Sequence, residues 1–248
     1  MIHYNECFKA KDIDEAWNHW YSMITSNTTT EQSRDGVVVG EIINATTTIE
    51  DPTRCILKSQ VRKLPMRYLV GELLWYMSGQ NTLKSIQTIT HAWDRMSDDG
   101  ETVNSNYGWC IQHKFGFDQW NYVKELLQKD PDTRQAVIHI KTAENSLEHP
   151  TKDMNCTVAI QFFIRQEKDG PKLHMTVYMR SNDLWMGFPN DVFQFTAMQI
   201  LMAMELGIGV GTYTHHAGSL HLYERDYKKS LENISASQPV EGEPFNDR

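Results

Sequence analysis

The chain has 248 residues, 40% of them hydrophobic and 23% charged, and it carries a formal net charge of −8. This composition is typical of a soluble globular protein, and the length allows one extensive core, so we expect a single domain over residues 1–248. The negative charge argues against stable binding of nucleic acid or a membrane surface, but it permits a small anionic ligand in a local basic pocket.

The cysteines and the N-terminus exclude further classes of protein. The four cysteines are far apart and show no CxxC spacing, so neither a zinc site nor a disulfide framework is predicted. The first residues show no basic segment followed by an apolar one, and no window approaches about 18 consecutive apolar residues. We therefore expect a chain that is neither secreted nor membrane-spanning, in a reducing cytoplasm.

The first half of the chain predicts helices around one long strand. Apolar residues at helical spacing predict a helix over 13–24, and β-branched residues over 36–52 predict extended structure. Residues 65–79 are apolar almost all round, which predicts a buried helix that ends at a glycine. A further helix is predicted from residue 118 to Asp130–Pro131.

The second half predicts strands and helices in mixed order. Residues 156–166 and 172–181 predict a hairpin that turns at Asp169–Gly170. The remaining elements are a strand over 135–140, a long methionine-rich buried helix over 191–209, a strand over 212–223 and an amphipathic helix over 224–235. Because the order shows no regular βαβ rhythm, we expect an α+β fold in which a mixed β-sheet packs against helices.

Three residues stand out as chemical candidates, each with a structural alternative. Cys156 opens a predicted strand, where its thiol is either a nucleophile at the edge of a cleft or a small buried hydrophobe. Glu72 interrupts an apolar helix, so it needs either a structural ion pair or a raised pKa that suits catalysis. Asp191 is surrounded by Trp, Met and Phe residues, and it either reads a ligand or caps a helix that begins at Val192.

Other polar groups and glycines give weaker signals. His215, His216 and His221 lie close in sequence to Tyr223, but the doublet lacks a third ligand at a recognisable spacing, so we expect no metal. The glycines of 207–211 follow a predicted helix rather than a strand, which favours a helix stop and a turn over a nucleotide-binding loop.

The strongest signal is a series of segments in a fixed order. They are GELLWYMSG, AWDRM followed by VNSNYGW, DPDTR, NCTVAIQF, RSNDLWMGFPNDV and GSLHLY. Together they resemble the thymidylate synthase superfamily, most closely its phage-type branch of deoxycytidylate hydroxymethylases, from about Arg34 to Tyr223. The resemblance implies a thymidylate synthase-like fold, a homodimer formed through the β-sheet, and a place in the cytoplasm of a bacterial or phage-infected cell.

The resemblance also assigns roles around a pyrimidine nucleotide. Cys156 matches the nucleophile that attacks C6, which makes C5 reactive toward the carbon of 5,10-methylenetetrahydrofolate. Glu72 matches the glutamate that organises water and moves protons, and Tyr107 matches the residue that assists proton removal at C5. His221 and Tyr223 match groups that bind the sugar.

The remaining family positions concern the phosphate and the folate. Asp183 matches the acid that holds the pterin and Trp93 the indole beside it, while Gln135 replaces the second of two arginines that the family lends across its dimer interface. The catalytic candidates are Cys156, Glu72, Asp191, Tyr107 and His221. The substrate-binding candidates are Arg34, Arg134, Arg180, Ser181, Asn182, Asp191, His221 and Tyr223; the folate-binding candidates are Trp93, Asp183, Gly187 and Glu72; no metal is implied.

Asp191 determines which pyrimidine is expected. Thymidylate synthases have asparagine at the matching position, whose amide can accept from N3–H of uracil and donate to O4. Cytosine reverses both demands, which are met by a protonated carboxyl, or by a carboxylate that faces N3-protonated cytosine. Each buried polar group left unpaired by the wrong base costs about 1–3 kcal/mol, or about tenfold to hundredfold in discrimination. A donor at N3 also stabilises the charge that develops there when a thiolate adds to C6.

The end of the chain indicates the product. Thymidylate synthases exclude water with an apolar C-terminal tail and a second tryptophan, whereas this chain has Met96 and the polar ending EGEPFNDR. We therefore expect a deoxycytidylate 5-hydroxymethyltransferase that converts dCMP, 5,10-methylenetetrahydrofolate and water into 5-hydroxymethyl-dCMP and tetrahydrofolate, for phage DNA modification. The alternatives are a dCMP methylase, a thymidylate synthase or hydroxymethylase that uses dUMP, and a non-catalytic regulator that binds a nucleotide or RNA.

Overall fold

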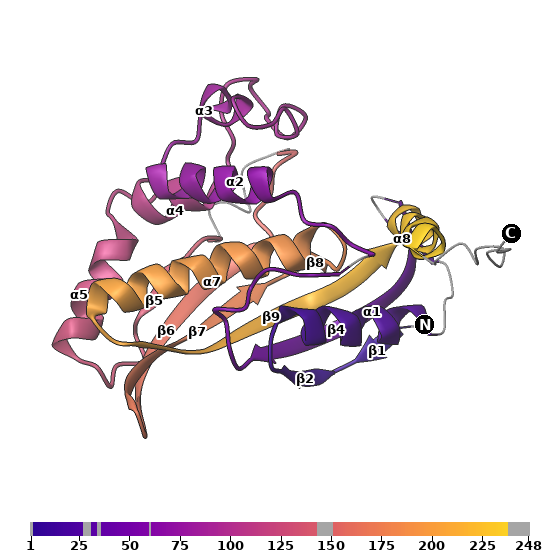
Figure 1. Cartoon of the computed structure of the whole chain (residues 1–248). Helices are drawn as coiled ribbons and strands as arrows, with labels where there is room; N and C mark the ends of the chain where they lie inside the picture. Colours follow the sequence, from indigo (N-terminus) through magenta and orange to yellow (C-terminus); the bar gives the residue numbers. More distant parts are fainter. Residues whose placement is uncertain (1, 27–30, 34–35, 60, 143–150, 238–248) are drawn as a thin grey trace, which may run out of the picture.

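The computed structural model describes residues 2–26, 31–33, 36–59, 61–142 and 151–237, which form a mixed β-sheet covered by helices (Figure 1). The strands are β1 (Ile2–Tyr4), β2 (Cys7–Ala10), β3 (Glu31–Ser33), β4 (Gly36–Ile49), β5 (Val137–His139), β6 (Thr157–Glu167), β7 (Gly170–Met179), β8 (Asn182–Asp183) and β9 (Gly209–Tyr223). The helices are α1 (Ile13–Thr25), α2 (Met66–Ser78), α3 (Leu83–Gln87), α4 (Tyr107–Gln112), α5 (Gln119–Lys129), α7 (Gly187–Leu206) and α8 (Glu224–Ser237).

The sheet mixes parallel and antiparallel pairs. Its strand order is β1-β4-β9-β7-β6-β5, with β2 and β3 paired to β4 and β8 paired to β9. β6 and β7 form the predicted antiparallel hairpin, whereas β7 and β9 run parallel because the chain crosses back through α7 between them. This arrangement confirms the expected α+β fold with a mixed sheet.

Helix α7 lies across one face of the sheet and forms the centre of the core. Figure 1 shows it running over β6, β7 and β9, with α2 and α4 on the side away from the sheet. Phe188, Phe195 and Met202 of α7 are fully buried, as are Phe162 and Val177 of the strands beneath it. Because α7 is covered on both sides, it is apolar all round. Groups on α2, α4 and α7 are thereby brought close to the strand ends.

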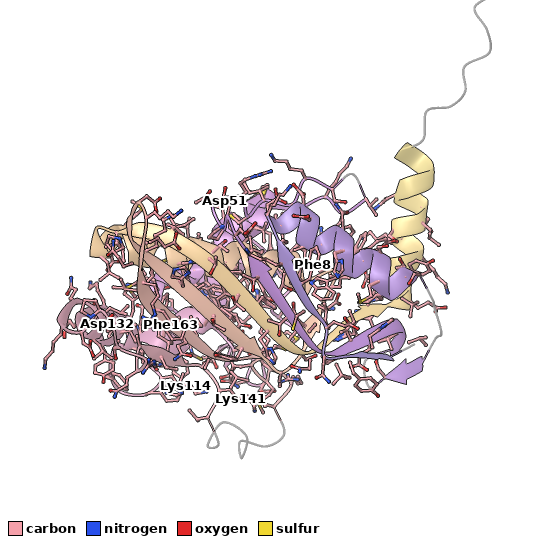
Figure 2. All side chains as sticks on the ribbon, turned by 90° about the horizontal axis from the view of Figure 1, so that it is seen from below. Phe8, Asp51, Lys114, Asp132, Lys141 and Phe163 are labelled. Atoms are coloured by element: carbon pink, nitrogen blue, oxygen red, sulfur yellow. The ribbon has the colours of Figure 1, made fainter. Side chains whose placement is uncertain are left out.

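The second face of the sheet carries hydroxyl, imidazole and aromatic side chains. Thr46, His216 and Tyr178 are cross-strand neighbours on β4, β9 and β7, and Thr46 Oγ1 lies 3.0 Å from Nδ1 of His216. Tyr178 is 38% exposed. Figure 2 labels Phe163 of β6, which follows the buried Phe162 and therefore points to the second face, since side chains alternate along a strand.

The ends of several elements differ from the prediction. α7 begins at Gly187, four residues before the predicted start. Pro189 is tolerated in the first turn, because the N–H groups there have no hydrogen-bond partner within the helix. Gly207, with a φ of 68°, ends α7 in a turn as expected, but β9 begins at Gly209, three residues before the predicted start of that strand. β6 begins at Thr157, so Cys156 precedes the strand rather than opening it.

No helix in the described ranges is long and apolar enough to cross a membrane. The described residues also contain no group of three or more His, Cys, Asp or Glu side chains that could hold a metal ion. The doublet His215–His216 illustrates why: neighbouring side chains on β9 point to opposite faces of the sheet, so His215 is buried under α7 while His216 lies on the second face.

Candidate active site

Cys156 lies at the end of a loop that hydrogen bonds hold in place. Its side chain is partly buried. Arg180 donates from Nε to the carbonyl of Asn155 and from Nη2 to that of Met154, at 3.0 Å each, and its amide donates to the carbonyl of Cys156 at 2.8 Å. Asn155 Nδ2 in turn donates to the carbonyl of Ser105 at 3.2 Å. These contacts fix the backbone that carries the thiol. They also hold the guanidinium of Arg180 against Met154 and Asn155, the two residues before Cys156.

Glu72 is buried in α2 and accepts hydrogen bonds on both carboxyl oxygens. Tyr68 donates its hydroxyl to Oε1 at 2.5 Å, and Gln194 donates from Nε2 to Oε2 at 3.0 Å. Burial raises the pKa of Glu72, which is 5% exposed, and hydrogen bonds from Tyr68, Tyr76 and Gln194 oppose that rise. The ion pairs among the described residues do not include Glu72, so the structural ion-pair alternative finds no support there.

Tyr107 opens α4 and packs between α2 and α7. Its ring centroid lies 5.2 Å from that of Tyr76 and 5.5 Å from that of Phe195. Gly108 permits this approach, because a Cβ at that position would lie 1.7 Å from the carbonyl oxygen of Tyr76. Burial raises the pKa of Tyr107 well above its ordinary value, and the negative charges of Asp191 and Cys156 raise it further. The phenol therefore stays protonated near neutral pH.

Asp191 lies inside α7 and is bonded to a side chain, not to main-chain amides. Asn182 of β8 donates from Nδ2 to Oδ2 of Asp191 at 2.7 Å. Because α7 begins at Gly187, Asp191 is in its second turn and cannot cap a helix that starts at Val192. The alternative reading of this acid as a helix cap is wrong.

The surroundings of Asp191 favour its protonated form. Burial raises the pKa of Asp191 to about 7, against the hydrogen bond from Asn182, and the negative charges of Glu72 and Asp183 add to the rise. The side chain is partly buried by area, and it interacts electrostatically with Glu72 of α2 and Tyr107 of α4. Near neutral pH the carboxyl therefore carries a proton in a large share of the molecules.

A buried polar row behind Asp191 was not predicted. His215 of β9 is 1% exposed, and its Nε2 lies 3.2 Å from Oδ1 of Asn182. The other ring nitrogen, Nδ1, lies 2.7 Å from the hydroxyl of Tyr213. Burial lowers the pKa of His215 to about 3, so the ring is neutral at physiological pH. In the sequence, His215 stands in a doublet with His216, which does not indicate this hydrogen-bonded role.

Four predicted catalytic residues come together from four separate segments. The charges of Asp191, Cys156 and Glu72 all raise the pKa of Tyr107, so these groups, from α2, α7 and the residue before β6, lie near the phenol of α4. A thiol can act there as a nucleophile, and two carboxyls and a phenol can hold or move protons. This combination suits addition to an unsaturated ring that must gain and lose protons.

The predicted phosphate ligands are only partly brought to these residues. Arg180 adjoins the Cys156 loop, and Ser181 follows it in the short link between β7 and β8. Arg134 is exposed, and its carbonyl accepts from Gln161, five residues beyond Cys156 on β6. At the rise of a strand this puts Arg134 roughly 16 Å away within one chain. Arg34 lies outside the described residues.

The predicted sugar and pterin ligands adjoin each other on β8 and β9. Asp183 accepts on Oδ1 from the amides of Trp185 and Met186, at 2.7 and 3.1 Å. His221 is opposite Asp183 in the parallel pairing of these strands, and its ring centroid lies 5.0 Å from that of Tyr223. Asp183, rather than Asp191, is thus the acid that supports the chain as it enters α7.

Two predicted folate-binding positions have different surroundings. The indole of Trp93 is partly buried, with its ring centroid 5.5 Å from that of Trp75 in α2. Gly187 lies beside the hydrogen-bonded side chains of Asn182 and Asp191. A Cβ at Gly187 would lie 2.8 Å from Asn182 Nδ2 and 3.3 Å from Asp191 Oδ2. The glycine therefore leaves room for the hydrogen bond between Asn182 and Asp191.

Comparison with known proteins shows the family and the fold of the chain. The family model described as thymidylate synthase matches residues 15–241. The deoxyuridylate hydroxymethyltransferase of Bacillus phage SP01 is 33% identical over 190 residues, which are 72% of this chain and 49% of that protein, so the chain spans about half the length of this curated relative. The structure of thermostable thymidylate synthase A from Bacillus subtilis has the same fold, with a TM-score of 0.73 at 21% identity over 90% of this chain and 84% of that one. The chain belongs to the thymidylate synthase family.

Proposed function

We propose that this protein transfers a one-carbon unit to C5 of a pyrimidine nucleoside monophosphate, and that it makes 5-hydroxymethyl-dCMP from dCMP. The observation that carries the proposal is the carboxyl of Asp191, which is held by Asn182 at 2.7 Å and whose pKa burial and the negative charge of Glu72 raise to about 7. Family membership supports the class of reaction. An acid where thymidylate synthases have an amide supports cytosine as the base.

In this reaction the thiolate of Cys156 forms a bond to C6, and the electron pair of the C5–C6 double bond moves into the ring. Asp191 donates its proton to N3 as negative charge develops there. C5 then acts as the nucleophile, and it later loses its proton with the help of Tyr107 and of water held by Glu72. Release of the thiolate from C6 restores the double bond, and N3 returns its proton to Asp191.

The residues present fit a bound folate. Asp183 is partly exposed, and its Oδ2 has no hydrogen-bond partner among the described residues, so it can accept from the N–H groups of a pterin. The partly exposed indole of Trp93 offers a flat surface beside α2. When bound, 5,10-methylenetetrahydrofolate supplies a carbon at the oxidation level of formaldehyde.

The hydroxymethyl product rests on access of water to the transferred carbon, because water gives hydroxymethyl where hydride gives methyl. Met96 is partly buried in the turn after Trp93, and it cannot exclude water as a second indole would. The polar C-terminal segment that contributed to this expectation lies outside the described residues. The origin of the relative in a phage supports a use of the product in phage DNA modification.

Hydroxymethylation of dUMP is the second candidate, and one observation favours it. The relative from Bacillus phage SP01 is named for deoxyuridylate, and it shares 33% identity with this chain. The two candidates differ only in the pyrimidine edge that faces Asp191. The two candidate reactions therefore share the thiol chemistry, and their substrates differ at N3 and in the group on C4.

We further propose a homodimer formed through the second face of the sheet. Thr46, His216 and Tyr178 on that face are partly exposed, and their mix of hydroxyl, imidazole and aromatic groups suits burial against a copy of itself. Arg134 lies too far from Cys156 within one chain to join its phosphate site. A dimer gives this arginine a role in the partner's site.

Product analysis tests the proposal. Purified protein is incubated with the folate and with dCMP or dUMP, and the nucleotide is analysed by mass spectrometry. Gain of one CH₂O unit on dCMP supports the proposal, and gain of CH₂ indicates methylation. Turnover of dUMP alone would overturn the assignment of cytosine. If Cys156→Ala kept all biological activity, or if the wild type released no tritium from C5 of dCMP, the protein would instead be a non-catalytic nucleotide- or RNA-binding regulator.

A further inference from the structure

A carboxylic acid does not by itself distinguish cytosine from uracil. With its proton on the oxygen that faces N3, it donates to N3 of cytosine and accepts from the amino group on C4 with its other oxygen. With the proton on that other oxygen, it donates to O4 of uracil and accepts from N3–H. Asp191 can therefore select cytosine only if the protein decides which oxygen carries the proton.

The buried row behind Asp191 provides such a device. Asn182 is 3% exposed, and both ends of its amide are engaged within the protein: Nδ2 with Oδ2 of Asp191 at 2.7 Å, and Oδ1 with Nε2 of His215 at 3.2 Å. His215 Nδ1 continues the row to the hydroxyl of Tyr213 at 2.7 Å. Asn182 thus reaches a nucleotide base only through Asp191.

The direction of each hydrogen bond follows from chemistry. An amide oxygen only accepts, so Nε2 of His215 carries the hydrogen that points to Asn182. The neutral ring then has a bare Nδ1, which accepts from the hydroxyl of Tyr213. Asn182 in turn donates to Oδ2 of Asp191. Every donor in the row points toward Asp191, and Oδ2 is held as an acceptor.

We propose that Asn182, oriented by His215, is a positioning residue that makes Asp191 selective for cytosine over uracil, because it keeps the proton off Oδ2 and leaves it on Oδ1 to donate to N3. This inference rests on the proposed function and names the residue that sets its substrate. Gly187 belongs to the same device, because a Cβ there would lie 2.8 Å from Nδ2 of Asn182.

Several titratable groups face Asp191 from the elements around it. Glu72, Tyr68 and Tyr76 lie on α2, Tyr107 on α4, Asp183 on β8 and Tyr213 on β9. The carboxylates of Glu72 and Asp183 raise the pKa of Asp191, and the tyrosines stay neutral because burial raises their own pKa values. The hydrogen bond from Asn182 lowers the pKa of Asp191, so removal of Asn182 should raise that pKa.

The first test needs no substrate. The carboxyl carbon of Asp191 is titrated by NMR in the full-length protein and in Asn182→Leu, which keeps the volume and removes the donor. Loss of a hydrogen bond to the ionised form should raise the pKa of Asp191 by about one to two units. Gln199→Leu is the matched control, since this buried amide of α7 donates to carbonyls of β7 and β9 and does not contact Asp191. An unchanged pKa in Asn182→Leu would overturn the proposal.

The second test measures selectivity. The ratio of kcat/KM for dCMP to that for dUMP should fall about tenfold in Asn182→Leu and stay constant in Gln199→Leu. Equal losses on both nucleotides would mean a merely structural role and would refute the inference. Failure of the wild type to use dCMP refutes the proposed function instead, so the two failures are distinct.

Two further measurements decide the matter if Asn182→Leu does not fold. Gly187→Ala should displace Asn182 and lower the same ratio, with the change in the same direction. The ¹⁵N spectrum of His215 in the wild type should show the hydrogen on Nε2. A hydrogen on Nδ1 would reverse the whole row, make Asn182 an acceptor toward Asp191, and contradict the proposal.

Discussion

Replacement of Asp191 by asparagine should change how the stability of the protein depends on pH. The folded state raises the pKa of this carboxyl from 3.8 to about 7, so the folded protein binds the proton more tightly than the unfolded chain does. The stability that comes from this proton is fully present below about pH 4, and it is lost as pH rises through about 7. Asp191→Asn has no such proton and should lack this loss.

The size of the effect follows from the shift. One pKa unit corresponds to about 1.4 kcal/mol, so a rise of about three units corresponds to about 4 kcal/mol between the two ends of the pH range. Because Asp191 is only partly buried by area, solvent reduces this figure, and we expect about 2–4 kcal/mol. The free energy of unfolding of the wild type, relative to that of the variant, should therefore fall by this amount from pH 4 to pH 8.

Urea unfolding at a series of pH values measures the difference. Wild type and Asp191→Asn are compared at one fixed protein concentration, because association of subunits makes apparent stability depend on concentration. Titrating groups that do not interact with Asp191 affect both proteins alike and cancel in the difference. A difference that stays flat from pH 4 to pH 8 would show that Asp191 is ionised in the folded protein at neutral pH. The proposed proton donor to N3 would then be absent.

Further substitutions test other parts of the site. Glu72→Gln should lower kcat by about 10²–10⁴-fold and remove the limb of the pH–rate profile set by this raised pKa, as measured by steady-state kinetics. Cys156→Ala should abolish release of tritium from C5 of dCMP, whereas its circular dichroism and binding of dCMP should persist. Gly108→Ala should destabilise the fold by about 1–3 kcal/mol in urea, because its Cβ meets the Tyr76 carbonyl. Tyr178→Lys should shift the protein toward monomer in analytical ultracentrifugation, and an unchanged dimer would exclude that face as the interface.

Periodicity predicted the long elements of the fold well. The hairpin of β6 and β7 follows from two β-branched runs around Asp169–Gly170, and α2 follows from an apolar run that ends at Gly79, whose φ is 67°. These signals are local, because each depends on residues that are neighbours in sequence. The short strands β1, β2, β3 and β8 and the short helices α3 and α4 carry too few residues for such a period, and they form because longer elements beside them supply partners.

The site could be predicted as a set of residues but not as an arrangement. Cys156, Glu72 and Asp191 were identifiable because a thiol or acid in apolar surroundings needs a reason. The contact between Asn182 and Asp191 joins a residue of a two-residue strand to a residue inside a helix. The orientation of Asn182 in turn depends on its contact with His215, which is 33 residues away in sequence. α7 begins four residues before its predicted start, and this difference places Asp191 inside the helix rather than at its cap.

The two acids of the site differ in how many donors each receives, and the proposed reaction gives them different roles. Glu72 accepts from Tyr68, Tyr76 and Gln194, whereas Asp191 accepts from Asn182. The negative charge of Glu72 raises the pKa of Asp191 and so favours the protonated form of Asp191. In the proposed reaction Asp191 is the proton donor to N3, and Glu72, held by its three donors, organises the water that takes the proton from C5. The proposed site thus gives a proton at one edge of the pyrimidine and removes one at the other.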